Sequence, residues 1–451
     1  METLGGRKTH TSATATSEVA VADTNAADSD RRFIRYVVAA TVVGGIWRLI
    51  RLISKWNVPL HYGDAWYYSI QAINNAHGRW FKEASGPVQN WGVLPGAEHP
   101  PLTSIVLAPA SLLSNPQFWQ RATMTLLGLA VIPLLAYLGR RLGGRRVGVV
   151  AAVIAAVYPN LWLSDALVMS ESLLLLFVVL VLVAALRYHE RFDMRSAVLL
   201  GVVIAVAGHA RSEVLMYAPL FALIGLRSRS AKLVLQQGLA VLAVVAVGVL
   251  PWVMYNSGRF DAVVAMSTNE GTTWLGANCP LTYGGPGLGG WNLDCLAFGN
   301  PPPHEDSAQR STRRRREAIA FARAHSSRLP VVVAARLLRA SDLYGLDESI
   351  RADVGEERPR WGIWAGILSW WILAPMAALG LWQVRRGVRY IVMVPVVGAV
   401  VVAVVFYGAH RLRAPIEPVV VLGAAMWIVA VPMAWLDRRR PRSGLGARRA
   451  T

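Results

Sequence analysis

Long apolar runs separated by short polar segments recur along the whole chain of 451 residues. About 20 residues of helix cross a ~30 Å hydrocarbon layer with every backbone group satisfied internally, and the pattern lacks the alternating segments of about ten residues that a membrane barrel needs. We therefore expect an all-α polytopic membrane protein of about ten spans. They lie near 33–54, 121–139, 146–163, 167–187, 196–210, 212–226, 233–252, 362–383, 390–408 and 418–436. The two short runs around 209–213 form either one kinked passage or two short ones.

Charge orients these spans. The chain carries 46 Lys+Arg against 27 Asp+Glu, a net charge of +19, and 54% of its residues are hydrophobic. The excess positive charge falls in short loops between apolar runs, which disfavours nucleic-acid binding and is typical of cytoplasmic loops. These loops are 140–146, 187–195, 227–232 and 385–389, with 438–440 after the last span. We expect both termini to be cytoplasmic.

This topology divides the chain into five parts. The first 30 residues lack the apolar core of a signal peptide and predict a disordered cytoplasmic tail. Two long segments then fall on the opposite side of the membrane, and the second contains REAIAFARAH and VVVAARLLRA, which predict interfacial helices. The parts are a tail (1–30), a transmembrane catalytic module (31–252) that includes the first external loop (55–120), an extracytoplasmic loop (253–361), C-terminal transmembrane helices (362–438) and a basic cytoplasmic tail (439–451).

The chain has only two cysteines, Cys279 and Cys295, and both fall in the second external loop. On an oxidising face of the membrane a disulfide that closes this short loop is the favoured interpretation, and two free thiols are the alternative.

An acid stands among aromatic residues just after the first span, in HYGDAWYY. One interpretation is an interfacial loop in which Trp66, Tyr67 and Tyr68 form an aromatic belt and Asp64 faces water. The other is a carboxylate held at the membrane surface, where it would act as general base on an acceptor hydroxyl.

Two further acidic motifs lie near the same predicted face. Glu98 and His99 precede two prolines in AEHPPL, which either mark the start of a helix or fix the angle of a functional pair. In SDALVMSES, Asp165 fits a helix cap. Glu171 is expected about a turn into an apolar helix, where an ionisable group indicates function.

Arginines complete the set. In HARSEV, Arg211 either forms a structural ion pair with Glu213 or faces an anion. The last external turn, YGAHRLRAPIEP, carries His410, Arg411 and Arg413, and a planar guanidinium suits phosphate oxygens. The sequence has no P-loop, Rossmann, zinc or nucleophile-elbow motif. Carboxylates and arginines at one boundary favour a lipid phosphate held by cations and a hydroxyl activated by an acid.

As an ordered set, these motifs resemble the GT-C superfamily of membrane glycosyltransferases, in the group that contains protein O-mannosyltransferases and the lipid A aminoarabinose transferase. The resemblance covers residues 33–436. It rests on GDAWYY, EHPPL, LVMSESLLLL, HARSEVL, PWVMYN and HRLRAPIEP in this order. The loop STNEGTTWLGANCPLTYGGPGLGGWNLDC is similar to that of actinobacterial members.

The resemblance implies a GT-C fold, a bacterial plasma-membrane location and an inverting transfer of sugar from a polyprenyl phosphate at the extracytoplasmic face, in cell-envelope glycan or glycolipid synthesis. It implies that Asp64 is the general base, that Glu171 is a second catalytic acid, and that a group of cations binds the donor phosphate. That group comprises His99, Arg211, Arg411 and Arg413. Substrate contacts are expected from Glu98, Trp66, Tyr67, Tyr68 and His410.

The sequence departs from the family at two points. Ala65 follows Asp64 where protein O-mannosyltransferases have Glu, so a protein acceptor is not implied, and the EHPP motif lacks the lysine of the aminoarabinose enzyme. The sugar and the acceptor, whether glycan, glycolipid or another hydroxyl compound, stay open. No cofactor is required, no metal-ligand cluster is apparent, and a divalent cation is optional. A transporter or flippase of lipid-linked sugars is the alternative function.

Overall fold

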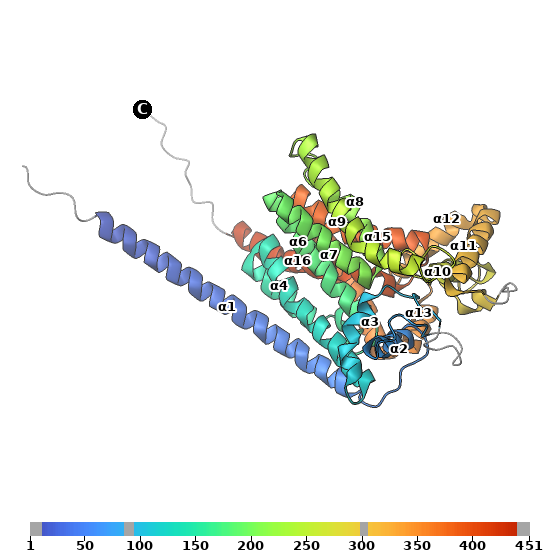
Figure 1. The fold of residues 1–451 in the computed structure, drawn as a ribbon. Helices are drawn as coiled ribbons and strands as arrows, with labels where there is room; N and C mark the ends of the chain where they lie inside the picture. Colours follow the sequence, from blue (N-terminus) through green and yellow to red (C-terminus); the bar gives the residue numbers. More distant parts are fainter. Residues whose placement is uncertain (1–10, 85–93, 298–304, 440–451) are drawn as a thin grey trace, which may run out of the picture.

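The computed structural model describes residues 11–84, 94–297 and 305–439. Within these ranges the chain is helical, and its one β feature is an isolated bridge between Lys82 and Pro95. The long helices run side by side in a bundle, and the shorter helices gather at one end of it (Figure 1). The principal helices are α1 (Thr11–Ile53), α2 (Asp64–Ala76), α3 (Leu102–Leu107), α4 (Pro116–Val157), α5 (Pro159–Trp162), α6 (Glu171–Arg191), α7 (Met194–Ala210), α8 (Tyr217–Ala222), α9 (Ala231–Ser257), α10 (Glu270–Ala277), α11 (Ser307–Ala324), α12 (Leu329–Ala340), α13 (Leu346–Gly355), α14 (Arg360–Trp382), α15 (Arg386–Val405) and α16 (Glu417–Arg439).

Seven helices of the described chain are long and apolar enough to cross a membrane. They confirm the expected all-α polytopic membrane class, whereas the count of ten spans stays a prediction. The expected disordered tail of residues 1–30 is helical from Thr11 onward, because α1 continues back beyond its apolar part, Asp28–Ile53. Residues 1–10, and residues 440–451 of the expected basic tail, lie outside the described ranges.

Helix α4 contains two of the predicted spans. Gly144 has a φ of 86°, a left-handed conformation that glycine adopts without steric cost. The chain folds back there, so a Cβ on Gly139 would lie 3.1 Å from the Cα of Gly148. Glycines at this crossing let the two halves of α4 approach closely.

The ambiguous region around residue 210 forms separate helical segments rather than one kinked helix, and the number of membrane passages there stays a prediction. Helix α7 ends at Ala210, a 3-10 turn (Ser212–Met216) follows, and α8 is only six residues long. Residues of this turn fold back on α7, since a Cβ on Gly208 would lie 2.2 Å from the Leu215 side chain.

Asp165 is not a helix cap. It lies in the turn between α5 and α6, is 1% exposed, and its Oδ2 accepts a 2.6 Å hydrogen bond from Nε of Arg48 on α1. Its other oxygen accepts from the Ser172 hydroxyl at 2.8 Å. A buried charge needs such a partner, so this pair fixes the start of α6 against α1.

The segment between α9 and α14 carries its own helices, α10 to α13, at the same end of the bundle as α2 and α3 (Figure 1). REAIAFARAH forms the second half of α11 and ends at the residue after it, His325, and VVVAARLLRA lies within α12. A disulfide joins Cys279 to Cys295 within this segment. Secondary elements from both long loops thus meet at one end of the apolar bundle.

Candidate functional site

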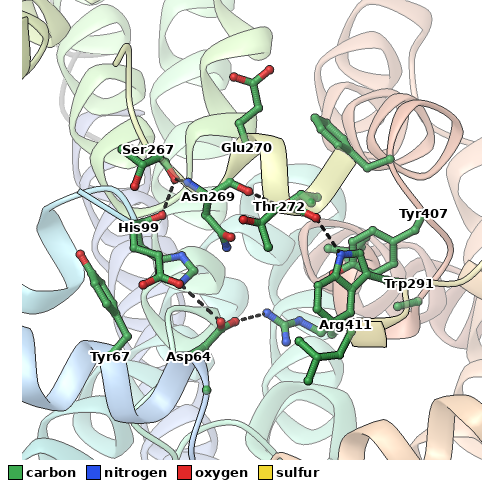
Figure 2. A pocket seen from close by; sticks show the side chains of 18 of the residues that line it. Asp64, Tyr67, His99, Ser267, Asn269, Glu270, Thr272, Trp291, Tyr407 and Arg411 are labelled. Carbon is green, nitrogen blue, oxygen red and sulfur yellow. Dashed lines mark hydrogen bonds and ion pairs between the residues drawn. The ribbon is translucent and has the colours of Figure 1, made fainter. Parts of the chain in front are cut away.

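A cavity of about 1320 Å³ lies where α2, the α10–α13 segment and the turn before α16 meet. Several residues that the sequence singled out line it, among them Asp64, Glu98, His99, Arg211 and Arg411. Figure 2 shows Asp64, His99 and Arg411 pointing toward one another inside it. The cavity therefore brings together polar groups from four separate parts of the chain.

Asp64 is the first residue of α2, directly after Gly63. The φ of Gly63 is 138°, a conformation open mainly to glycine, and it turns the chain sharply into the helix. Behind Asp64, the rings of Tyr67 and Tyr68 are 3% and 2% exposed and belong to a small apolar core. The carboxylate thus stands on a rigid base while its side chain remains 30% exposed to the cavity.

Two basic side chains approach Asp64. Arg411 donates from Nη2 to its Oδ2 at 2.7 Å, and Nε2 of His99 lies 3.3 Å from its Oδ1. The His99 ring is held between Tyr67 and Tyr68, with ring centroids 5.0 and 4.8 Å away. The aromatic residues near Asp64 thus orient a histidine as well as lining the cavity.

Burial raises the pKa of the Asp64 carboxyl, but the charges of His99 and Arg411 outweigh burial and hold the pKa well below its usual range. Asp64 is therefore a carboxylate at neutral pH and accepts a proton readily only when its hydrogen bond to Arg411 is broken.

Arg411 is shared among three carboxylates. Besides Asp64, it pairs with Glu356, and its Nε lies 3.5 Å from Oε1 of Glu171. The same Glu171 oxygen lies 3.6 Å from Nη1 of Arg211. Glu171 therefore lies between the two arginines and sets the distance between them.

Arg211 has further partners on its own side. It donates from Nε to Glu213 at 2.7 Å and from Nη1 to the Ser170 hydroxyl at 3.3 Å. The ion pair considered from the sequence is thus present, and Arg211 also lines the cavity. The two interpretations of Arg211 are compatible.

Glu171 lies elsewhere than the sequence indicated. It is the N-terminal residue of α6 rather than a residue one turn inside a helix, and it is 3% exposed. It lines a small cavity of about 30 Å³ behind Arg411 and not the large cavity. It contacts both arginines, which favours a positioning role, and its assignment as a catalytic acid stays a prediction.

Arg413 does not line the large cavity either. It is 3% exposed, donates to Asp342 at 2.5 Å and to Glu417 at 2.9 Å, and its guanidinium lies 4.1 Å from the Trp370 ring centroid. A guanidinium with these partners is not available to a ligand. This placement disfavours Arg413 as a ligand of the donor phosphate, a role that stays a prediction, whereas Arg411, expected in the same group, lines the cavity.

His410 lines the cavity, but its ring is engaged. Its Nε2 pairs with Asp353, and its Nδ1 lies 3.2 Å from Asp342. It links α13 to the turn that carries Arg411, so its structural contacts are clear while a direct substrate contact stays a prediction.

Sequence reasoning missed the segment 353–358, DVGEER, which ends just before α14. Glu356 pairs with Arg411, Glu357 pairs with Lys55 and Arg121, and Arg358 pairs with Asp353 at 2.8 Å. The signal was present, since this run of charges directly precedes an apolar helix. The partners of Glu356 and Glu357 lie more than 50 residues away along the chain, and the sequence does not specify them.

Glu98 of the EHPP motif and Trp66 also lie at the cavity. The Glu98 side chain lines the cavity, and its buried Oε2 has no hydrogen-bond partner among the described residues. The Glu98 carbonyl accepts from the Ser267 hydroxyl, which ties the motif to the chain just before α10. Trp66 lines the cavity as well.

The opposite wall of the cavity comes from α10 and α11. Asn269 and Thr272 face the Asp64 side (Figure 2), and Nη1 of Arg314 donates to the Thr272 hydroxyl at 2.9 Å. Within the described ranges, no group of three or more His, Cys, Asp and Glu side chains is placed to hold a metal ion.

Comparison with known families supports the resemblance. Residues 98–255 match a family model described as dolichyl-phosphate-mannose-protein mannosyltransferase, which covers less than half of the chain. No match was found among curated proteins.

Solved structures confirm the expected fold. The oligosaccharyltransferase AglB of Archaeoglobus fulgidus, in complex with an inhibitory peptide and a dolichol-phosphate, matches 93% of this chain with a TM-score of 0.54 and 12% identity. This chain spans 52% of that one. A structure of an A. fulgidus oligosaccharyltransferase with Zn and sulfate matches 89% of this chain, with a TM-score of 0.52 and 13% identity. The match covers 50% of the oligosaccharyltransferase chain. At these identities the likeness shows the fold alone, which is the GT-C membrane fold.

ArnT from Cupriavidus metallidurans in the apo state matches 90% of this chain and 78% of its own at 16% identity, with a TM-score of 0.40.

Proposed function

We propose that the protein is an inverting glycosyltransferase that moves a sugar from a polyprenyl phosphate to an acceptor hydroxyl. The observation that carries this proposal is the meeting of Asp64 and Arg411 inside a large cavity at one end of an apolar bundle. A carboxylate that can take a proton beside a guanidinium that can hold phosphate is what such a transfer requires.

The choice of donor is supported by the comparisons. The description of the family model that residues 98–255 match names a dolichyl-phosphate sugar. The archaeal enzyme of similar fold was solved with a dolichol-phosphate. A cavity adjoining membrane-spanning helices suits a donor whose lipid tail stays in the bilayer.

In the proposed step, Asp64 takes the proton of the acceptor hydroxyl as its oxygen attacks the anomeric carbon. The bond from that carbon to the phosphate oxygen breaks from the opposite face, and its electron pair leaves with the polyprenyl phosphate. Arg411 and Arg211, with His99 when protonated, stabilise the charge that develops on the phosphate. The anomeric configuration is inverted because the attack and the departure occur on opposite faces.

Binding of the donor also prepares the base. The phosphate competes with Asp64 for Nη2 of Arg411, while Glu356 and Glu171 keep the guanidinium in place. Loss of this hydrogen bond raises the proton affinity of Asp64. Asp64 therefore becomes an effective base only when the donor is bound.

The location and partners follow from the same proposal. The basic short loops support an orientation with both termini in the cytoplasm and the cavity on the extracytoplasmic side. The membrane of this proposal is a bacterial plasma membrane. The acceptor is a glycan, a glycolipid or another hydroxyl compound of the cell envelope. Guanidinium groups neutralise the phosphate, and a divalent cation is optional.

The test is transfer of radiolabelled sugar from synthetic polyprenyl-phosphate sugars in proteoliposomes, for the wild type and for Asp64→Asn. Loss of a general base lowers the rate about 10²–10⁴-fold. Asp294→Asn is the matched control, because Asp294 is exposed and has no ion-pair partner among the described residues. Equal rates for the folded Asp64→Asn variant and the wild type would refute the base assignment. Movement of intact lipid-linked sugar across the membrane without any transfer would support the flippase instead.

A further inference from the structure

We propose that the acceptor carries a negatively charged group, a carboxylate or a phosphate, which Arg314 of α11 binds at the end of the cavity away from the bundle. This inference rests on the proposed function and deepens it by naming a chemical class of acceptor. It assigns a second anion site, separate from that of the donor phosphate.

The arginines of α11 differ in their partners. Arg313 pairs with Glu305 and Glu317 at 2.9 Å, and Arg315 pairs with Glu270 at 3.2 Å. Arg314 has no carboxylate within ion-pair distance in the described ranges, and the partner that the structure gives it is the neutral Thr272 hydroxyl. It is therefore a half-buried cation on the cavity wall that has no anion in ion-pair contact among the described residues, and Glu305 and Glu317 act on it only from a longer distance.

The surroundings of Arg314 make this costly. Burial, followed by the like charges of Arg310 and Arg313, lowers the pKa of the Arg314 guanidinium from its ordinary value. An arginine nevertheless keeps its charge at neutral pH. An anion in the cavity would relieve this repulsion, and a guanidinium binds carboxylate and phosphate through two parallel hydrogen bonds.

This site is distinct from the donor site. Arg411 is carried by the turn before α16 and faces Asp64, whereas Arg314 belongs to α11, which packs against α10. Asn269, directly before α10, and Thr272 of α10 lie on the cavity wall that faces Asp64 (Figure 2), and the Thr272 hydroxyl accepts from Arg314. A ligand that reaches both Asp64 and Arg314 therefore spans the cavity, with its hydroxyl at one end and its charge at the other.

The lining between the two ends suits a sugar ring. Asn269, Thr272 and Thr273 offer amide and hydroxyl groups, and Trp291 lies beside Thr272, whose carbonyl accepts from the indole N–H at 3.3 Å. Hydroxyl-rich acceptors need such groups, and an aromatic side chain offers a face to the ring. Together they favour an anionic saccharide as the acceptor.

The probes are methyl β-D-glucuronide and methyl β-D-glucoside, which share ring hydroxyls and differ by one carboxylate. Binding of each to the purified protein is measured by ligand-observed NMR in nanodiscs of zwitterionic lipid only. We expect the wild type to bind the glucuronide about tenfold more tightly, the scale of one charge-assisted hydrogen bond. Arg314→Gln should abolish this difference. Arg316→Gln should keep it, because Arg316 is exposed on the same helix and does not line the cavity.

Equal affinity of the wild type for the two probes, or equal loss in both arginine variants, would overturn the inference. In a second arm, the nanodiscs contain anionic phospholipid. If this lipid weakens glucuronide binding to the wild type but not to Arg314→Gln, the site binds a lipid headgroup. That result would overturn the assignment of an anionic saccharide as the acceptor.

These outcomes are separable from failure of the proposed function. The binding assay needs no turnover and no donor, so an enzyme that transfers sugar can still lack the anion site. Conversely, a protein that transfers no sugar can still discriminate between the probes.

Discussion

Nη2 of Arg411 donates a 2.7 Å hydrogen bond to Oδ2 of Asp64, across 347 residues of sequence. The proposed reaction requires this hydrogen bond to break, since Asp64 must take a proton and Arg411 must hold a phosphate. Their contact without ligand keeps Asp64 charged and holds Arg411 in place. Donor binding is then the event that separates them, which couples activation of the base to occupancy of the phosphate site.

Arg411→Gln tests this coupling. Removal of the guanidinium should raise the donor KM about tenfold or more, because a charge-assisted contact to phosphate is lost. It should also move the acid limb of kcat/KM to higher pH, because the pKa of Asp64 rises once its cationic partner is gone. Rates measured across pH with saturating acceptor check both effects.

Arg411→Lys separates charge from geometry. It should keep the acid limb near its wild-type position while the donor KM stays raised, because an ammonium cannot replace the planar fork that contacts Asp64, Glu171 and Glu356. An Arg411→Gln enzyme with an unchanged acid limb would contradict the pairing of Arg411 with the working base.

The sequence predicted the membrane bundle well, because hydrocarbon thickness and the cost of unpaired backbone groups leave few alternatives to long apolar helices. It also singled out Asp64, His99, Arg211 and Arg411, which share the cavity. Charged residues beside apolar segments are energetically costly, so each of these residues can be recognised in the sequence as a candidate for function.

The sequence did not predict which acidic and basic side chains pair with each other. Arg411 and Arg413 are two residues apart in the same turn, yet one faces the cavity and the other is buried between Asp342 and Glu417. The 3-10 geometry of residues 410–416 sends neighbouring side chains in different directions. Glu356 escaped notice for a similar reason, since its role depends on where the α10–α13 segment folds.

Stability at acidic pH should depend on Asp64. Its pKa in the folded protein lies below the unfolded value of about 3.9, so its ion pair stabilises the fold above that pH, and the contribution is lost as pH falls through the folded pKa. We expect Asp64→Asn to lower the Tm at pH 7, and the difference from the wild type to shrink below about pH 4. Thermal unfolding in one detergent from pH 3 to 7 measures this, with Asp294→Asn as the variant that should follow the wild type throughout. A constant difference at all pH values would show that the ion pair does not titrate as inferred.

Glu357 should matter for stability and for donor affinity together. Its carboxylate is 3% exposed and pairs with Arg121 at 2.8 Å and Lys55 at 3.0 Å. Glu357→Gln leaves two cations without their counter-charge, and loss of one partner from a buried pair costs about 3–5 kcal/mol. Because the segment 353–358 is then less firmly anchored, Glu356 should hold Arg411 less firmly. The donor KM of Glu357→Gln should therefore rise.

The matched control is Glu190→Gln, which breaks a half-exposed pair with Arg141 and should cost less than about 1 kcal/mol. Thermal unfolding and donor KM, measured for both variants, check the prediction. A Glu357→Gln protein as stable as Glu190→Gln would show that the segment 353–358 is held by other contacts.

Removal of divalent cations should leave the transfer rate unchanged, because the proposed neutralisation of phosphate relies on Arg411 and Arg211. The matched comparison is sugar transfer by protein dialysed against EDTA, before and after addition of Mg²⁺ or Mn²⁺, with Glu98→Gln assayed in parallel. Glu98 lines the cavity with an oxygen that has no hydrogen-bond partner in the described part of the chain, so it is the first carboxylate to test if a cation proves necessary. Loss of transfer in EDTA that a metal restores would reassign part of the phosphate charge to a bound cation, and loss of that rescue in Glu98→Gln would place the cation at Glu98.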